Sequence, residues 1–367
     1  MTMPHTSTTP STPSTTPSES SSAATPIILD TQPERADLPL VVMPAVLRSM
    51  IAPLSAQLER LRDVARVRMY GDFTEGEDLI AERTAGATVM LNGGPHISNA
   101  LLRRLHADGL KCIVFSGTGV ASYIDLALAR DLGMRICNAV HYGDAAVAEH
   151  TFALLFELKR RVGALDAGIK SGGWSGPYAD GMQLAGRRLG IIGLGGIGGA
   201  VARIARALDM DVSAWWTGHT PVDRFMRYGV TPVDDLGALI AASDVVTVHL
   251  PLIDGVTRGI VTADHLARLK PGALFVNTAR AEVIAPGALT ERLARGDVNA
   301  ALDVFDKEPL PADDPLRTML NVILTPHVAW RTDGAFADLT RQMVDATLAY
   351  LDGRDVNVIV SEHDREA

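Results

Sequence analysis

Residues 189–198 read Leu-Gly-Ile-Ile-Gly-Leu-Gly-Gly-Ile-Gly, and the fold prediction rests on them. The apolar run that begins at Leu189 predicts a buried strand, which leads into Gly193, Gly195 and Gly198 at G-x-G-x-x-G spacing. Apolar residues then recur at helical intervals as far as Leu208, so a helix begins where the glycines end. Strand, glycine turn and helix in this order favour a dinucleotide-binding fingerprint over an ordinary glycine-rich turn. Such glycines allow the tight turn, backbone approach to a pyrophosphate and close helix packing, while the helix N-terminus attracts phosphate.

Composition limits the class of protein. The chain has 367 residues, enough for two domains, and 47% of them are hydrophobic. A net charge of -9 argues against a nucleic-acid surface, and no apolar run is long enough to span a membrane. Cys112 and Cys137 lie in apolar, strand-like runs, which favours buried thiols in a reducing, cytoplasmic compartment. We expect no metal site.

The order of predicted elements gives the domain organisation. Residues 1–38 are rich in Ser, Thr and Pro and predict a disordered tail without the features of a secretory signal. From Pro39 onward strands and helices alternate, which predicts doubly wound parallel sheets. We expect a dinucleotide-binding Rossmann domain over 151–328. A discontinuous substrate-binding domain would comprise 39–150 and 329–357, with the active site in the cleft between the domains.

Three polar residues follow apolar runs in the second predicted domain: Arg280, Glu308 and His327. In a doubly wound sheet the ends of these strands face the same crevice as the glycine turn. A guanidinium pairs with a carboxylate at two points, an imidazole exchanges protons near neutral pH, and a carboxylate orients an imidazole. Each residue alone has an ordinary surface explanation, but together beside the fingerprint they predict catalysis.

Several motifs in a fixed order make the chain resemble one family over about 39–358. They are the fingerprint, Val246-Thr-Val-His-Leu-Pro251, Lys270-Pro-Gly-Ala273, Asn277-Thr-Ala-Arg280, Ala301-Leu-Asp-Val-Phe305, Glu308-Pro309 and Thr325-Pro-His327. Together they resemble the D-isomer-specific 2-hydroxyacid dehydrogenase family. The resemblance implies flavodoxin-like and Rossmann-like domains, a homodimer, and reversible hydride transfer between a nicotinamide cofactor and a small D-2-hydroxy acid or 2-oxo acid. Glyoxylate, hydroxypyruvate and phosphoglycerate exemplify the substrate class.

The resemblance also implies roles for residues. Arg280 would bind the substrate carboxylate and carbonyl oxygen, His327 would act as general acid and base, and Glu308 would pair with His327. The residues expected to bind the cofactor are Val147, Gly193, Gly195, Gly196, Ile197, Gly198, Trp216, Thr217, His249, Leu250, Pro251, Thr278, Ala279, Arg280 and Asp303. The residues expected to bind the substrate are Asn92, Gly93, Gly94, Gly117, Thr118, Arg280 and His327.

Two departures from the family pattern matter. Trp216 stands where an acid would bind the adenosine ribose, so NADP is admissible, although no Arg follows at once and we expect NAD. Ala281 and Ala285-Pro286 replace the usual Gly and acidic pair, which alters a loop beside Arg280 without removing a catalytic group.

Two other functions remain open. A cofactor-sensing corepressor, in which NAD(H) stabilises a dimer and partner binding is the output, could keep all three polar residues. A formate dehydrogenase is disfavoured because that relative has Gln where Glu308 stands.

Overall fold

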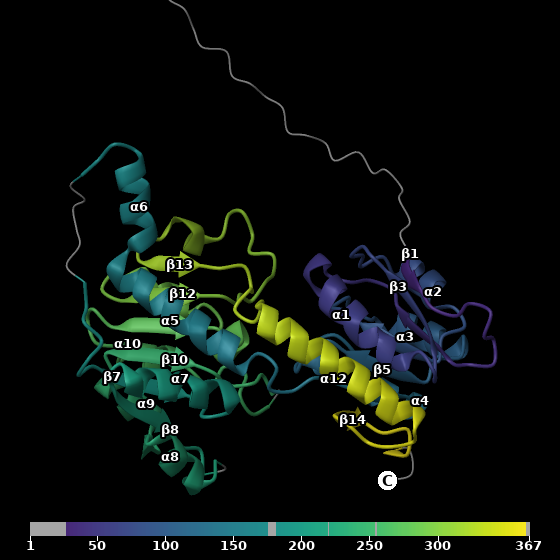
Figure 1. Ribbon diagram of the computed structural model, residues 1–367. Helices are drawn as coiled ribbons and strands as arrows, with labels where there is room; N and C mark the ends of the chain where they lie inside the picture. Colours follow the sequence, from purple (N-terminus) through teal and green to yellow (C-terminus); the bar gives the residue numbers. More distant parts are fainter. Residues whose placement is uncertain (1–26, 175–180, 219, 254, 365–367) are drawn as a thin grey trace, which may run out of the picture.

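The computed structural model describes residues 27–174, 181–218, 220–253 and 255–364, which form two α/β domains with one seven-stranded sheet each (Figure 1). The two doubly wound parallel-sheet domains predicted from the sequence are confirmed. In spatial order, the first sheet contains β1 (Ile27–Asp30), β3 (Arg66–Tyr70), β2 (Leu40–Met43), β4 (Val89–Asn92), β5 (Cys112–Phe115), β6 (Arg135–Cys137) and β14 (Val358–Val360). The second contains β13 (Val322–Leu324), β12 (Asn299–Leu302), β11 (Leu274–Asn277), β10 (Val245–Val248), β7 (Arg188–Ile192), β8 (Asp211–Trp215) and β9 (Thr231–Val233).

Helices cover both sheets. In the first domain they are α1 (Ile51–Leu58), α2 (Glu77–Thr84), α3 (Asn99–Ala107), α4 (Leu126–Leu132) and α12 (Asp333–Leu351). Those on or near the second sheet are α5 (Asp144–Arg160), α6 (Val162–Lys170), α7 (Gly196–Ala207), α8 (Val222–Tyr228), α9 (Leu236–Ala242), α10 (Ala263–Ala267) and α11 (Ala288–Leu293). Short 3-10 turns span Arg48–Met50, Glu59–Leu61, Val120–Ser122, Ala281–Val283 and Pro315–Thr318. Among the described residues, no helix combines the length and the hydrophobicity needed to cross a membrane.

The strand orders place the binding crevices. The parallel strands β3-β2-β4-β5-β6 follow the flavodoxin-like order 2-1-3-4-5, and antiparallel β1 and β14 add to the two edges. In the second sheet β9-β8-β7-β10-β11-β12 follows the Rossmann order 3-2-1-4-5-6. The direction of winding reverses between β7 and β10, and this is where an open α/β sheet binds its ligand.

The N-terminal prediction is wrong in part. Ile27–Asp30 forms β1, which pairs with β3, so disorder does not extend to residue 38. The apolar residues Ile27, Ile28 and Leu29 can add to an edge strand because β3 offers unpaired backbone groups. The preceding residues 1–26 lie outside the described part of the chain.

Helix α5 carries the chain to the second sheet. Its buried side chains Ala148, Phe152, Leu155 and Leu158 join the core that contains β7 and α7. The boundary expected at residue 150 therefore falls inside this helix, because its hydrophobic face packs on the second sheet along most of its length. The domain bounds otherwise stay a prediction.

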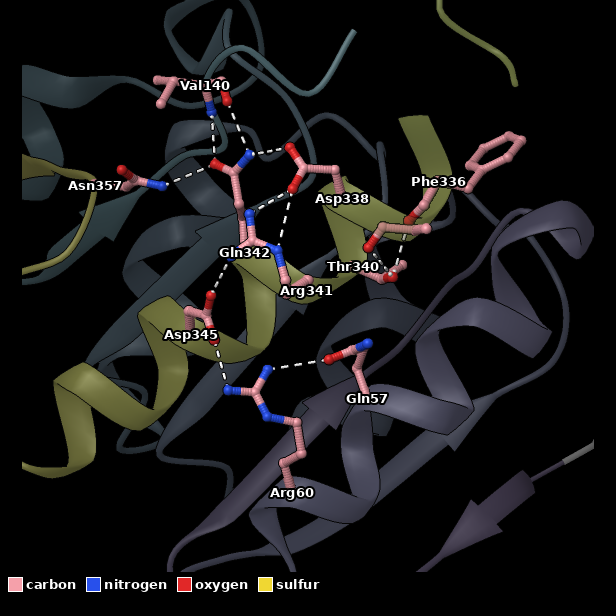
Figure 2. Close-up of polar contacts among 11 residues, drawn as sticks. Gln57, Arg60, Val140, Phe336, Asp338, Thr340, Arg341, Gln342, Asp345 and Asn357 are labelled. Carbon is pink, nitrogen blue, oxygen red and sulfur yellow. Dashed lines mark hydrogen bonds and ion pairs between the residues drawn. The ribbon is translucent and has the colours of Figure 1, made fainter. Parts of the chain in front are cut away.

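Helix α12 returns the chain to the first domain. Phe336, Leu339 and Met343 pack in its core, and the helix lies along α1 (Figure 1). Figure 2 shows how Gln342 of α12 holds the backbone that precedes α5: its side chain accepts from the Val140 amide (3.0 Å) and donates to the Val140 carbonyl (2.8 Å). Asn357 donates to the same Gln342 oxygen, at 3.0 Å. The buried Gln342 amide thus joins the segment just before the chain leaves the first domain to the helix on which it returns.

Candidate active site

The glycine turn after β7 has the geometry that a dinucleotide requires. Gly193 has φ +105°, and a Cβ there would lie 2.8 Å from the backbone carbonyl of His249. A Cβ on Gly198 would collide with the carbonyl oxygen of Gly193, so α7 can pack this close only with glycine. Gly195 caps α7, and a Cβ on it would meet no atom within 4 Å. The turn therefore leaves an open space beside a helix N-terminus, which fits a pyrophosphate.

A pocket of about 190 Å³ adjoins this turn. Its lining residues are Gly193, Leu194, Gly195, Trp215, Thr217, Thr220, Arg224, His249, Leu250 and Pro251. Six of the cofactor residues expected from the sequence are therefore in this pocket wall. Trp216 is absent from the lining: it packs against the core beneath α7, and its Nε1 donates to the carbonyl of Thr220 (3.0 Å). Its neighbour Trp215 lines the pocket instead, because successive residues of an extended chain point to opposite faces.

His249 is buried in the pocket wall, with 7% of its surface exposed. Burial lowers the pKa of its imidazole to about 3, so the ring is neutral. Neither ring nitrogen has a hydrogen-bond partner among the described residues. Buried polar atoms without partners are rare, and these two indicate that a bound ligand completes the site.

The first turn of α7 lies against the start of α5. A Cβ on Gly196 would collide with Asp144, whose Oδ2 lies 2.8 Å from Nδ1 of His141. Ile197 packs against the second-domain core. Gly196 thus contacts the chain entering α5, whereas Gly195 borders the open space.

Arg280 extends from the turn after β11. Asn277 fixes this turn: its side chain accepts from the Ala279 amide (3.0 Å) and donates to the Arg280 carbonyl (2.9 Å). The Arg280 guanidinium is half-buried and donates to the carbonyl of Ala279 at 2.7 Å. Thr278 is buried between these residues, with its hydroxyl 3.2 Å from that of Thr151 on α5. Val147, one turn earlier on α5, is also buried and its carbonyl accepts from the Thr151 hydroxyl.

Glu308 and His327 form a pair beside Arg280. Glu308 Oε2 lies 2.8 Å from Nδ1 of His327, and Oε1 accepts from the amide of Phe305 at 3.0 Å. Burial raises the pKa of Glu308, but the hydrogen bond and charge of His327, the Phe305 amide and the charge of Arg280 together lower it. Because an ionised carboxylate can only accept, Nδ1 carries the shared proton and Nε2 is the nitrogen that can meet a substrate.

Asp303 fixes the loop that carries His327. Its carboxylate is fully buried and accepts from the Thr325 hydroxyl (2.6 Å) and from the amides of Val328 (3.0 Å) and Ala329 (2.9 Å). His327 itself has φ +53°, an unusual conformation for a side-chain-bearing residue that the surrounding bonds must maintain. The predicted contact between Asp303 and the cofactor stays a prediction, and the structure adds this positioning role.

The expected substrate turns lie in the first domain. Asn92 is fully buried and closes its own turn, accepting from the Gly94 amide (2.9 Å) and donating to the Pro95 carbonyl (3.1 Å). Gly93 packs against the carbonyl of Ala45, so any Cβ would clash there. In the next turn, Gly117 packs against the ring of Phe115, and Thr118 donates to the Ala139 carbonyl at 2.9 Å. The side chains of Asn92 and Thr118 therefore shape these loops.

The residue of these turns that reaches Arg280 is Gly119. A Cβ on Gly119 would lie 2.7 Å from Nη2 of Arg280, so the guanidinium lies directly against its backbone. The sequence pattern matched the Gly117-Thr118-Gly119 turn to a substrate loop of the family, but it did not predict that Gly119 would contact Arg280.

Two tyrosines also interact electrostatically with Arg280: Tyr123, which ends a loop expected to shape the substrate pocket, and Tyr142, which was not predicted. Burial raises the pKa of Tyr123, on which the charges of Arg280 and Glu308 act in opposite directions. Burial raises the pKa of Tyr142 to about 12, again against the charge of Arg280. Tyr123 stacks on His96 and borders an open pocket of about 530 Å³ in the first domain. Both phenols thus lie within the electrostatic reach of Arg280, which sequence spacing could not reveal.

No cluster of three or more His, Cys, Asp or Glu side chains suited to a metal ion occurs within the described ranges. The chemical groups of the candidate site are a guanidinium, a carboxylate–imidazole pair and the glycine turn, all at carboxyl ends of strands in one sheet. This is the arrangement of a nicotinamide-dependent oxidoreductase site.

Comparison with known proteins supports the same class of site. Residues 152–329 match the family model described as "D-isomer specific 2-hydroxyacid dehydrogenase, NAD binding domain". Glycerate dehydrogenase of Methylorubrum extorquens is 33% identical over 291 residues, which cover 76% of this chain and 88% of that protein. The chain therefore belongs to the D-isomer-specific 2-hydroxyacid dehydrogenase family, and NAD(P) is its cofactor class.

Other similar proteins differ in length. D-3-phosphoglycerate dehydrogenase of Methanocaldococcus jannaschii is 34% identical over 276 residues, 75% of this chain and 51% of that protein. The chain thus spans about half the length of such relatives.

The crystal structure of the TT0316 protein from Thermus thermophilus superposes with a TM-score of 0.74 at 30% identity, covering 88% of this chain and 100% of that one. These relatives favour the dehydrogenase over the corepressor hypothesis.

Proposed function

We propose that the chain catalyses the reversible NAD(P)-dependent interconversion of a small 2-oxo acid and its D-2-hydroxy acid. The observation that carries the proposal is the Glu308–His327 pair, held at 2.8 Å within the field of Arg280. The names of two relatives contain glycerate and phosphoglycerate, and both compounds belong to the substrate class that we propose.

Each residue has a separate role in this proposal. Arg280 binds the substrate carboxylate through its planar fork and polarises the carbonyl oxygen. His327 delivers a proton from Nε2 to that oxygen during reduction and removes it during oxidation, while Glu308 keeps the ring oriented through Nδ1. A bound nicotinamide would supply the hydride to C2 of the substrate in reduction, or accept it from that carbon in oxidation. Asp303 holds the His327 loop in place.

The proposal is tested with a panel of glyoxylate, hydroxypyruvate, pyruvate and bulkier 2-oxo acids, with NADH and NADPH in turn. We expect reduction of at least one acid to its D-hydroxy product, measured by loss of nicotinamide absorbance and chiral product analysis. A protein that binds the cofactor but reduces no acid in the panel, and that captures a protein partner only when cofactor is present, would favour the corepressor hypothesis instead.

We also propose a homodimer in which α6 contacts the second copy. Helix α6 projects from the second domain (Figure 1) and contains no buried residue. Val162, Leu165 and Ile169 on this helix, with Trp174 after it, expose 38–90% of their surfaces. Exposed apolar surface of this kind marks an interaction site.

Light scattering after gel filtration tests the dimer. The Leu165→Asp/Ile169→Asp double variant should be monomeric, while the control Leu320→Asp, at a fully exposed position, should remain a dimer. A wild-type monomer would contradict the proposal.

A cytoplasmic location is proposed from the cysteines. Cys112 and Cys137 are both free and buried on the adjacent strands β5 and β6, which suits a reducing compartment. Fractionation of cells that express the tagged chain is the test, and recovery in a secreted or periplasmic fraction would contradict it.

A further inference from the structure

The pocket beside the glycine turn carries one formal charge among its described lining residues, and it is positive. Arg224 of α8 reaches back toward the turn and donates to the carbonyl of Leu194 at 3.4 Å. Among the described residues this is the one hydrogen bond of its guanidinium, and it engages one of five N–H donors. Its other four N–H donors have no partner within the described ranges, and the residue lines the pocket.

No carboxylate lines this pocket in the described part of the chain. In NAD-selective Rossmann domains an acid at the end of the second strand binds the ribose hydroxyls, and its charge repels a 2′-phosphate. Here β8 ends at Trp215, and the acid of that strand, Asp211, is its first residue, at the opposite end. The repelling group is therefore missing at the place where it would act.

The other polar lining residues are neutral. His249 is uncharged because burial lowers its pKa to about 3, and both its buried nitrogens lack partners among the described residues. Thr220 and Thr217 add hydroxyl-bearing side chains to the same wall. Hydroxyls and a guanidinium are suitable donors for a phosphate monoester, and the guanidinium fork bonds such a group at two points.

We infer that Arg224 binds the 2′-phosphate of the adenosine ribose and makes NADP(H) the preferred cofactor. This differs from the NAD expected from the sequence. No Arg follows the strand directly, but the fold returns Arg224 to the pocket from a helix that begins seven residues after Trp215. The inference rests on the proposed function only for the use of a nicotinamide dinucleotide.

The test is direct binding of NADPH and NADH without substrate, by isothermal titration calorimetry. We expect wild type to bind NADPH about ten- to hundred-fold more tightly than NADH, the factor of one or two charge-assisted hydrogen bonds. Arg224→Ala should remove this preference and leave NADH affinity within about twofold, and Arg224→Lys should restore part of it. The matched control is Arg227→Ala, an exposed arginine on the same helix that does not line the pocket.

Three results would overturn the inference: wild type binding NADH as tightly as NADPH, Arg224→Ala weakening both cofactors equally, or Arg227→Ala acting like Arg224→Ala. Because the binding measurement contains no substrate, it tests the cofactor preference independently of the proposed reaction. NADPH-selective binding without turnover would contradict the reaction alone, and turnover with an NADH preference would contradict the cofactor assignment alone.

Discussion

Nη2 of Arg280 lies against the backbone of Gly119, where a Cβ would stand only 2.7 Å away. Arg280 comes from the second domain and Gly119 from the first, so this contact joins the two sides of the candidate site. The guanidinium can therefore occupy this position only because residue 119, in the other domain, is a glycine without a Cβ atom.

Gly119→Ala should displace Arg280 while leaving the fold intact. The new methyl group pushes against the end of a flexible side chain, so the guanidinium moves and substrate capture weakens. We expect kcat/KM for the oxo acid to fall about ten- to hundred-fold with cofactor affinity unchanged. Steady-state kinetics measure this, with Ser122→Ala in the same turn as control, and unchanged kinetics would show that the contact is irrelevant.

His327→Gln should lower turnover by about 10²–10⁴-fold, because positioned acid–base catalysis contributes that much. Glutamine can still bond Glu308 but cannot donate and recover a proton. Cofactor affinity, measured by nicotinamide fluorescence, should be unchanged. Near-normal turnover with every oxo acid would refute the assignment of His327.

Arg280→Lys should impair substrate binding heavily despite keeping the charge, because an ammonium lacks the planar fork. We expect KM to rise about ten- to hundred-fold, and Arg280→Ala to be worse. Initial-rate kinetics with saturating cofactor provide the measurement. A lysine variant with wild-type KM would mean that Arg280 does not hold the substrate carboxylate.

The Glu308–His327 pair should make stability depend on pH in acid. The pKa of Glu308 is lower in the folded protein than its ordinary value of about 4.3, so the unfolded chain binds the proton more readily. The contribution of Glu308 is thus fully present above that ordinary pKa and is lost as the pH falls through the lower, folded value. Urea titrations at several pH values should show wild type and Glu308→Gln converging as the pH falls below about 4. A gap that stays constant or widens would refute the lowered pKa.

Gln342→Ala should destabilise the first domain by about 1–3 kcal/mol, since the Val140 amide and carbonyl would lose their partner (Figure 2). Arg341→Ala on the preceding residue is the control: its contacts to Asp338 and Asp345 are solvent-exposed and should contribute about 0–1 kcal/mol. Denaturant unfolding gives both values. Equal effects of the two changes would contradict the bridging role of Gln342.

The sequence by itself determined the fold class and the family, and it predicted the chemistry of the site. Periodic apolar residues and the glycine spacing around Gly193 predict strand, turn and helix because they act over a few residues. The motifs ending in Arg280 and His327 were also local, since both residues follow their own strands directly.

Tertiary structure decided what depends on residues far apart in the chain. Gly119 contacts Arg280, and Arg224 contacts the carbonyl of Leu194 in the glycine turn, although each pair is far apart in the sequence. Only the packing of the helices and strands brings these residues together. The same holds for Asp303, whose carboxylate holds a loop more than twenty residues later, and for Ile27–Asp30, which is ordered by pairing with β3. Local sequence sets backbone preference and periodicity, but contacts between distant segments are set by packing, and packing here fixes where each charged group can act.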